Sequence, residues 1–347
     1  MDGDLPGEKP RMTTSQSKIL AGDVGGTKTN VALFEASGDD LRPVRQATFA
    51  SGEHASLAEI LQQFLHARSG EAVPVACIGV AGPVIEGKSH ITNLGWELDE
   101  GVLAEMTGIG RVKLLNDLEA TAYGMLHLRP NELASLNPKA EQRRKANIAV
   151  IAAGTGLGEA MLYWDGEHYH PIASEGGHVD FAPRTDQEIE LLRYLRRELD
   201  GHVSYERVLS GPGIHNLYRF LRQSSGRAEP AWLAERLQAG DPSATITDVG
   251  LTGQDPLCVA TLDLFASIYG AEAGNLALKC LAFGGVFVAG GIAPKLLPAL
   301  QKNENFLRGF TDKGRFAGLL GRLRVDVSLN PRAALRGAAY YAARLHA

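Results

Sequence analysis

One pattern in this 347-residue chain constrains its fold more than any other: a short apolar strand, a glycine turn and a second strand occur twice. The first copy lies within Lys18–Ala36 and joins KILAGDV to TNVALFEA. The second lies within Asn147–Trp164 and reads NIAVIAAGTGLGEAMLYW. The repeat predicts two related lobes with a cleft between them, and the length of the chain fits two domains better than one.

Further apolar runs of strand length alternate with helical patterns along the chain. Strands are predicted at Val75–Gly82, Val112–Asp117 and Gly284–Gly291, and near Arg322–Val327. Helices are predicted around Leu57–Leu65, Leu98–Met106, Leu118–Leu126, Glu188–Leu199, Gly213–Leu221, Pro256–Leu281 and Ala333–His346. This alternation is typical of an α/β fold with mostly parallel sheets covered on both faces. The polar segments 129–146 and 222–253 are expected to be surface insertions.

The composition argues against several classes of partner. The chain has 35 Lys and Arg against 40 Asp and Glu, a net charge of -5, which gives no electrostatic footprint for nucleic acid or an anionic membrane. No run approaches the ~18 apolar residues that a membrane span needs. Residues 1–17 lack the apolar segment of a signal peptide, so we expect a flexible tail there. Cys77, Cys258 and Cys280 are expected to be buried thiols, which indicates a cytoplasmic protein.

The first glycine cluster has the composition of an anion site. Gly25, Gly26 and Thr27 offer successive N–H groups and a hydroxyl, and glycine lets a bulky phosphate approach the backbone. Asp23, at the end of an apolar strand, could hold Mg²⁺ directly or through water. The alternative is a tight hairpin with a type I′ or II′ turn and no ligand.

The second cluster, Gly154-Thr155-Gly156-Leu157-Gly158, is not a dinucleotide fingerprint. That motif requires a helix after the glycines, whereas EAMLYW continues as a strand, and no P-loop motif occurs in the chain. Two glycine turns between strands therefore favour a pair of phosphate-binding hairpins. A third cluster, Gly290-Gly291, ends a buried strand and either approaches a nucleoside or only packs a helix against that strand.

Polar residues at strand ends and in glycine-rich loops are candidates for a hydroxyl-rich ligand. Asn116 and Asp117 close an apolar strand, although the same residues could cap the helix that follows. Glu175 and His178 flank two glycines, with a solvated turn as the alternative. Glu206 precedes a predicted helix and could instead be a capping acid.

Five motifs in this order closely resemble those of the bacterial ATP-dependent glucokinases. They are GDVGGTKT (Gly22–Thr29), LNDLEA (Leu115–Ala120), AAGTGLGEA (Ala152–Ala160), EGGHVDFAPR (Glu175–Arg184) and ERVLSGPG (Glu206–Gly213). The resemblance covers Lys18–Ala347 and implies the two-lobed hexokinase/actin-like (ribonuclease H-like) ATPase fold with a cleft between the lobes. It places a small α/β domain at 18–127, completed by a C-terminal helix within 328–347, and a large α/β domain at 128–327.

The resemblance also implies a role for each motif residue. Asp23 with the Gly25-Gly26-Thr27 turn is similar to the first phosphate loop, Gly154-Thr155-Gly156 to the second, and Gly290-Gly291 to the adenosine-site turn. The residues that match sugar-hydroxyl ligands are Asn93, Asn116, Asp117, Glu175, His178 and Glu206, with Asp117 in the place of the catalytic base. The activity implied is transfer of the γ-phosphoryl group of ATP to the 6-hydroxyl of glucose, with Mg²⁺, in a homodimer.

Two other functions stay open at this point. The first is a kinase for another hexose, such as fructose, mannose or an N-acetylated amino sugar. The second is a non-catalytic sugar sensor of the same fold, which is disfavoured because Asp23 and Asp117 are present and no DNA-binding helix pair precedes Lys18. Nothing after His178 resembles the zinc-binding cysteine segment of the related ROK kinases and repressors. ADP and polyphosphate remain possible donors.

Overall fold

The computed structural model describes residues 17–37, 40–66, 72–199 and 201–346. The expected flexible tail, 1–17, lies outside the described residues except for Ser17. That residue does not belong to a tail, because it is the first residue of strand β1, Ser17–Val24, and pairs with Ala36.

The described chain divides into two compact units. One comprises the residues up to Leu115 together with Ala338–His346, and the other comprises Asn116–Gly337. The expected borders were at 127/128 and 327/328. The segment 116–127 belongs with the second unit in the structure because its helix α3, Asp117–Met125, packs on strands β10 and β11 of that unit.

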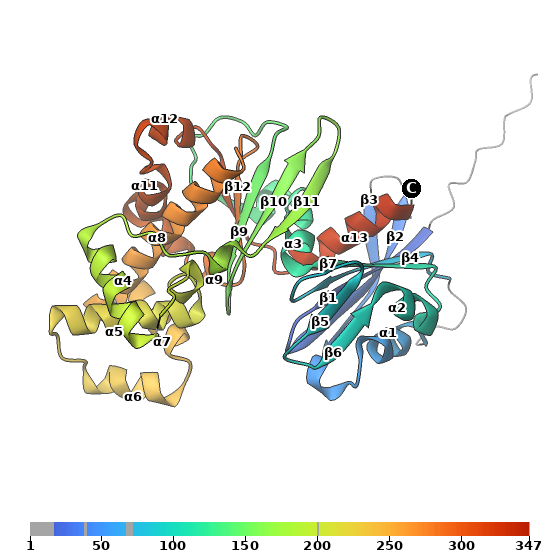
Figure 1. The fold of residues 1–347 in the computed structure, drawn as a ribbon, viewed down its shortest axis with the longest axis horizontal. Coiled ribbons are helices and arrows are strands. Elements are labelled where there is room, and N and C mark those ends of the chain that lie inside the picture. The colour runs from blue at the N-terminus through green and yellow to red at the C-terminus, as the bar shows by residue number, and fades with distance from the viewer. Residues whose placement is uncertain (1–16, 38–39, 67–71, 200, 347) are drawn as a thin grey trace, which may run out of the picture. The chain divides into compact units, whose positions relative to one another are not determined.

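The first unit is built on a sheet with the strand order β3-β2-β1-β4-β7 (Figure 1). β1 pairs antiparallel with β2 and parallel with β4. Helix α1 buries Leu57, Ile60, Leu61 and Phe64, which recur at helical spacing. The remaining bounds are β2 Lys28–Ser37, β3 Asp40–Ala50, η1 Ser51–Glu53, α1 Leu57–His66, β4 Val75–Val80, β5 Lys88–Ile91, β6 Trp96–Asp99, α2 Glu100–Thr107 and β7 Arg111–Asn116.

The second unit repeats this plan in a sheet with the order β11-β10-β9-β12-β13-β8. β9, Ile148–Ala153, pairs antiparallel with β10, Leu157–Trp164, and parallel with β12, Val286–Ala289. A glycine turn thus joins the first antiparallel pair in both units, as the sequence repeat predicts. The other strands are β8 Leu133–Ser135, β11 Tyr169–Ser174 and β13 Val325–Ser328.

Helix α8, Pro256–Lys279, is the core of the second unit and contacts α5, α7, α11 and β9. Among the described residues it is the one helix long and apolar enough to cross a membrane, but 78% of its most apolar window is buried, which is typical of a core helix. The other helices and short turns are η2 Pro130–Glu132, η3 Gly176–His178, α4 Asp186–Glu198, η4 Tyr205–Arg207, α5 Gly211–Ser225, α6 Ala231–Ala239, α7 Pro242–Leu251, α9 Ile292–Lys295, α10 Leu297–Gln301, η5 Lys302–Glu304, α11 Asn305–Thr311, η6 Gly314–Phe316, α12 Ala317–Leu320 and α13 Ala333–His346.

The interpretation of the two polar segments as surface insertions is wrong in part. Segment 129–146 contains β8, which pairs with β13 at the edge of the second sheet. Segment 222–253 contains α6 and α7, and α7 buries Ile246 and Val249 in the core. The three cysteines are buried thiols, as expected, and burial raises the pKa of Cys258 to about 12 and that of Cys280 to about 11.

Candidate active site

One serine, Ser51, stabilises the first glycine turn through two hydrogen bonds. Ser51 donates its hydroxyl to the carbonyl oxygen of Gly25 at 2.9 Å and its N–H to the carbonyl oxygen of Thr27 at 3.0 Å. Neither Gly25 nor Gly26 has a positive φ, so the type I′ or II′ hairpin considered from the sequence is wrong. No sequence motif indicates the role of Ser51, because η1 lies next to the turn only in the folded chain.

Asp23 is the penultimate residue of β1, beside this turn, and is partly buried. Burial raises the pKa of its carboxyl group above the usual range, and the amide of Asn30, which donates to Oδ2 at 3.4 Å, opposes that shift. Thr48 donates its hydroxyl to Oδ1 of Asn30 at 2.8 Å and so orients the amide. A buried carboxylate held by one neutral donor retains the capacity to attract a cation.

Asn93 is brought to the same place as the turn within the first unit. It is exposed on the loop between β5 and β6, and a Cβ added at Gly26 would lie 3.5 Å from its Nδ2. A residue predicted to bind sugar therefore neighbours a turn predicted to bind phosphate.

The second glycine turn is held against the start of α5. Gly154 donates its N–H to the carbonyl oxygen of Gly156 at 2.8 Å, and Gly211 donates its N–H to the carbonyl oxygen of Gly154 at 2.9 Å. Ser243 of α7 donates its hydroxyl to the carbonyl oxygen of Gly211. The N-terminal end of α5, which carries a partial positive charge, is thereby fixed beside the turn.

Glu206 lies directly on this second turn. Its Oε2 accepts the N–H of Leu157 at 3.0 Å, and a Cβ at Gly156 would collide with the same oxygen. The interpretation of Glu206 as a helix cap is wrong, because Ser210 caps α5 by accepting the N–H of Gly213 at 3.1 Å.

Glu175 directly precedes η3 and His178 is the last residue of this turn, which packs on β10. A Cβ at Gly177 would collide with the carbonyl oxygen of Leu157, so only glycine lets the loop approach this strand so closely. The side chains of Glu175 and His178 are 70% and 61% exposed, and His178 Nε2 lies 4.0 Å from Glu175 Oε2. The glycines pack inward while the two polar side chains face solvent, available to a ligand.

Asn116 and Asp117 stand at the N-terminus of α3. Asn116 is the N-cap of a capping box: its Oδ1 accepts the N–H of Leu118 at 2.9 Å, and Glu119 accepts the N–H of Asn116 at 3.0 Å. The capping interpretation of Asn116 is therefore confirmed. Oδ1 of Asp117 also accepts the N–H of Leu118, at 2.8 Å.

The position of α3 brings these two residues to β10. The Cδ2 of Leu118 lies 2.5 Å from the position that a Cβ at Gly158 would occupy. Because Gly158 has no side chain, α3 can approach β10 closely at this point. Three of the predicted sugar-binding segments, those of Asp117, Glu175 and Glu206, thus contact β10 at its first residues.

A cavity of about 680 Å³ opens beside the second turn. Gly290 backs onto Ala153, the last residue of β9, while Gly291 lines the cavity. Gly290 thus packs against the neighbouring strand β9 and not between a helix and its own strand, as the alternative from the sequence had it, and Gly291 has no heavy atom within 4 Å of its Cβ position. The lining residues are Gly154, Thr155, Gly211, Pro212, Ile214, His215, Asp241, Pro242, Ser243, Ala244, Thr247, Asp248, Gly291, Ile292, Lys295 and Leu296.

The sequence interpretation missed the contribution of α7 to this cavity. Its start was detectable, since Asp241 caps the helix by accepting the N–H of Ser243 at 2.9 Å and Pro242 occupies the first helical position. No sequence motif indicated that Thr247 and Asp248 line the cavity.

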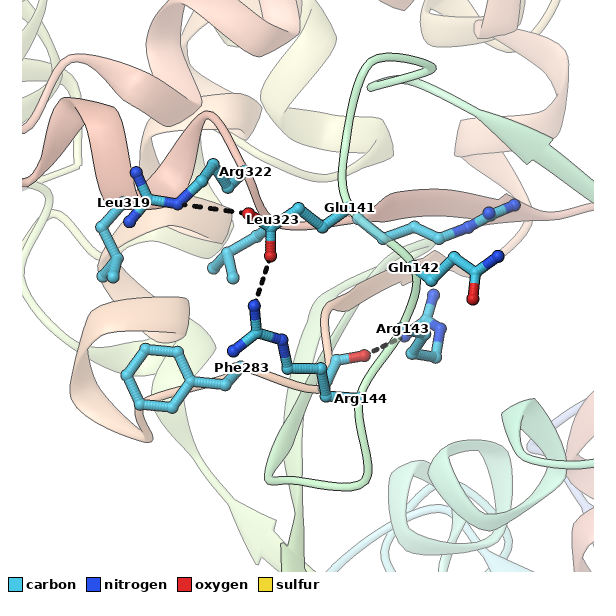
Figure 2. Close-up of a pocket in the computed structure, with 10 residues that line it drawn as sticks. Glu141, Gln142, Arg143, Arg144, Phe283, Leu319, Arg322 and Leu323 are labelled. Atoms are coloured by element: carbon cyan, nitrogen blue, oxygen red, sulfur yellow. Dashed lines mark hydrogen bonds and ion pairs between the residues drawn. The ribbon is translucent and has the colours of Figure 1, made fainter.

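A smaller cavity of about 110 Å³ lies elsewhere in the second unit, and Figure 2 shows Glu141 between Arg144 and Arg322 within it. Arg143 donates to the carbonyl oxygen of Gly284 and to Asp326, each at 2.8 Å. The ion pair with Asp326 and the hydrogen bond to Gly284 attach Arg143 to β13 and to the residues just before β12.

The family model and the curated relatives identify one family. A family model described as Glucokinase matches residues 20–345. The glucokinase of Trichormus variabilis is 44% identical over 94% of this chain and 99% of its own length. The crystal structure of a glucokinase from an Antarctic psychrotroph has a TM-score of 0.84 and 32% identity, covering 94% of this chain and 99% of that one.

A more distant structure shows the same fold. The glucokinase from Balamuthia mandrillaris, solved in complex with glucose, has a TM-score of 0.79 at 22% identity and covers 96% of this chain and 95% of that one. The expected fold class, a two-lobed α/β hexokinase-like fold, is confirmed by these likenesses.

Proposed function

The chain belongs to the glucokinase family, and we propose that it transfers the γ-phosphoryl group of ATP to the 6-hydroxyl of D-glucose. The observation that carries the proposal is the convergence of sugar-binding and phosphate-binding segments on one strand. Leu118 packs over Gly158, Gly177 packs on Leu157, and Glu206 accepts the N–H of Leu157.

The two glycine turns would hold the phosphates of ATP. In each turn the glycines leave the backbone uncovered, so that N–H groups can approach an anion that bears several charges. Thr27 and Thr155 are both exposed and would add hydroxyl donors. The N-terminus of α5 beside Gly154 would contribute its partial positive charge.

Asp23 fits a role at Mg²⁺. Among the described residues no group of three or more His, Cys, Asp or Glu side chains could hold a metal ion alone. Mg²⁺ often keeps several waters and binds through one carboxylate and the substrate phosphates, which suits the single carboxylate of Asp23. The ion would neutralise charge on the transferred phosphoryl group.

The sugar would be bound by side chains from several segments. Glu175 and His178 offer an acceptor and a ring nitrogen, and Asn93, Asn116 and Glu206 offer further polar groups to the ring hydroxyls. An analogue that lacks one of these hydroxyls would leave its polar partner in the site unpaired once the sugar covers it, which is the basis of selectivity in such sites.

Asp117 would act as the general base. Its carboxylate would accept the proton of the 6-hydroxyl as that oxygen attacks the γ-phosphorus, while positioning and electrostatic stabilisation supply most of the rate. Asn116 keeps Asp117 at the first position of α3 by capping the helix.

The cavity beside Gly154 would hold the nucleoside of ATP. Ala244 on α7 is exposed and lines the cavity, so the Ala244→Trp side chain would enter the cavity without displacing core residues. We expect its KM for ATP to rise at least tenfold, about 1.4 kcal/mol of lost binding, with little change in the KM for glucose. Ala239→Trp, at an exposed position of α6 outside the lining, is the matched control. An unchanged KM for ATP in Ala244→Trp would place the nucleoside elsewhere.

Initial rates over a panel of sugars and donors test the proposal. Glucose, mannose, fructose and N-acetylglucosamine are each paired with ATP, ADP and polyphosphate. We expect glucose with ATP to give the highest kcat/KM. A higher value for another hexose would make that hexose the substrate, and sugar binding without turnover would favour a sensor.

Cytoplasmic localisation and a homodimeric state are part of the proposal. The buried thiols support a reducing compartment, and sedimentation of the purified protein would test the dimer.

A further inference from the structure

Two carboxyl groups are buried side by side, and one of them, that of Glu159, packs against Gly176 of the Glu175–His178 loop. Glu159, in β10, is 1% exposed, and Glu272, in α8, is completely buried. Their side chains share a hydrogen bond. Neither residue has a role in the phosphoryl transfer proposed above, yet a buried acid pair is costly unless it is compensated.

Glu272 is held by a hydrogen-bond network that reaches Tyr205. Asn275 donates to Oε2 of Glu272 at 2.8 Å and lies 3.0 Å from the hydroxyl of Tyr205. Tyr205 immediately precedes Glu206 in η4. Lys279 lies 3.4 Å from Oε1 of Glu272.

Glu159 supports the other sugar-binding segment. A Cβ at Gly176 would collide with Oε2 of Glu159, so this carboxyl group packs directly against η3. Within the described residues Oε1 of Glu159 accepts no hydrogen bond, as suits a carboxyl group that carries a proton itself. Burial, and next the negative charge of Glu272, raise the pKa of Glu159 to about 8.

We propose that Glu159 and Glu272 together position the Glu175–His178 loop and η4 for glucose, with Glu159 protonated in the binding-competent form. The inference rests on the proposed function, because it concerns the same sugar site. Loss of the proton from Glu159 would place two negative charges next to each other beside η3. Their repulsion would displace Gly176 from its packing position on β10. Glucose binding should therefore weaken in alkaline solution.

Other titratable groups interact with the pair and belong to the same account. They are Tyr269 and Cys280, which face Glu159, and Tyr205, Lys279 and Lys313, which face Glu272. Burial raises the pKa of Tyr205 and Tyr269 far above neutrality and that of Cys280 to about 11, so these three groups stay neutral between pH 7 and 9.

The size of the effect follows from the fraction of protonated Glu159. With a pKa of about 8, roughly nine-tenths of the molecules are competent at pH 7 and about one-tenth at pH 9. If the ionised form does not bind glucose, the KM for glucose rises about eight- to tenfold over this interval, because apparent affinity scales with the competent fraction.

The experiment measures the KM for glucose of the full-length protein at saturating ATP between pH 7 and 9. Glu159→Gln keeps the neutral form of the side chain, so its KM should stay flat across the interval. Glu235→Gln, an exposed acid on α6, is the matched control and should follow the unmodified protein. A flat KM in the unmodified protein, or an equal rise in Glu159→Gln, would overturn the inference.

A second readout does not require activity. A raised pKa means that Glu159 contributes stability fully below its usual pKa of 4.5 and that this contribution is lost as the pH rises through about 8. The urea midpoint of the unmodified protein should therefore fall relative to that of Glu159→Gln between pH 6 and 9. A constant difference between the two urea midpoints would overturn the inference that Glu159 is protonated in the folded protein.

The two readouts separate this inference from the proposed function. If the protein does not phosphorylate glucose but its urea midpoint depends on pH as described, the protonated pair exists without the proposed activity. The role of the pair at the sugar site would then be wrong. If Glu159→Gln does not fold, Glu272→Gln replaces it: without the charge on Glu272 the two negative charges are never brought together, so the rise in KM between pH 7 and 9 should shrink. An undiminished rise in that variant would contradict the inference.

Discussion

Asp117→Asn is expected to lower kcat for glucose phosphorylation by about 10²- to 10⁴-fold, the usual contribution of a general base, while the Kd for glucose changes little. The substitution keeps an oxygen that can accept the N–H of Leu118, as Oδ1 of Asp117 does at 2.8 Å. Helix α3 should therefore start at the same place, and the loss should be confined to turnover. Stopped-assay turnover and calorimetric titration with glucose measure the two quantities separately.

Asp186→Asn is the matched control for this substitution. Asp186 is also the first residue of a helix, α4, behind a side-chain N-cap, Thr185, and it is exposed. Its kcat should equal that of the unmodified protein. If Asp117→Asn retains kcat within tenfold, Asp117 is not the base, and another group must accept the proton.

Gly177→Ala is expected to reduce kcat/KM for glucose by about 10²-fold or more. The added methyl group meets the carbonyl oxygen of Leu157, which is backbone and cannot move aside without moving β10 or η3. Displacement by about 1 Å of a group that positions substrate can cost 10²-fold in rate. Glu175 and His178 would both be displaced, so the KM for glucose should rise more than the KM for ATP.

Gly318→Ala controls for the effect of adding a methyl group in the same unit. No heavy atom lies within 4 Å of the Cβ position at Gly318, a residue of α12. Its kinetics should match those of the unmodified protein, and its thermal midpoint should not fall. Unchanged kcat/KM in Gly177→Ala would show that the packing of η3 on β10 does not set the sugar site.

The sequence predicted most elements that carry a strong apolar pattern. The second glycine turn followed by a strand was recognised because EAMLYW continues the alternation, and β10 occupies those residues. β3 was missed because DLRPVRQATFA is rich in polar residues and contains Pro43. Such a sequence suits an edge strand, where one side of the backbone needs no partner, and β3 is the edge of its sheet.

The candidate site could be predicted only as far as motif residues reveal it. Asn116 and Asp117 were found because they follow an apolar strand, but the sequence could not decide between a cap and a ligand, and Asn116 is a cap. Ser51, which hydrogen-bonds to the first turn from a separate segment, and Glu272 had no local signal, and Glu159 belonged to a recognised motif that did not indicate its buried partner. Their roles depend on which segments the fold brings together.

Identification of the product from ATP and glucose tests the central claim most directly. The purified protein is incubated with ATP, Mg²⁺ and glucose, and the phosphate ester is located on the sugar by ³¹P NMR, with 6-deoxyglucose as the control acceptor. The account predicts glucose 6-phosphate in a one-to-one ratio with ADP and no ester with 6-deoxyglucose. An ester on another hydroxyl, or ADP without any sugar phosphate, would contradict it.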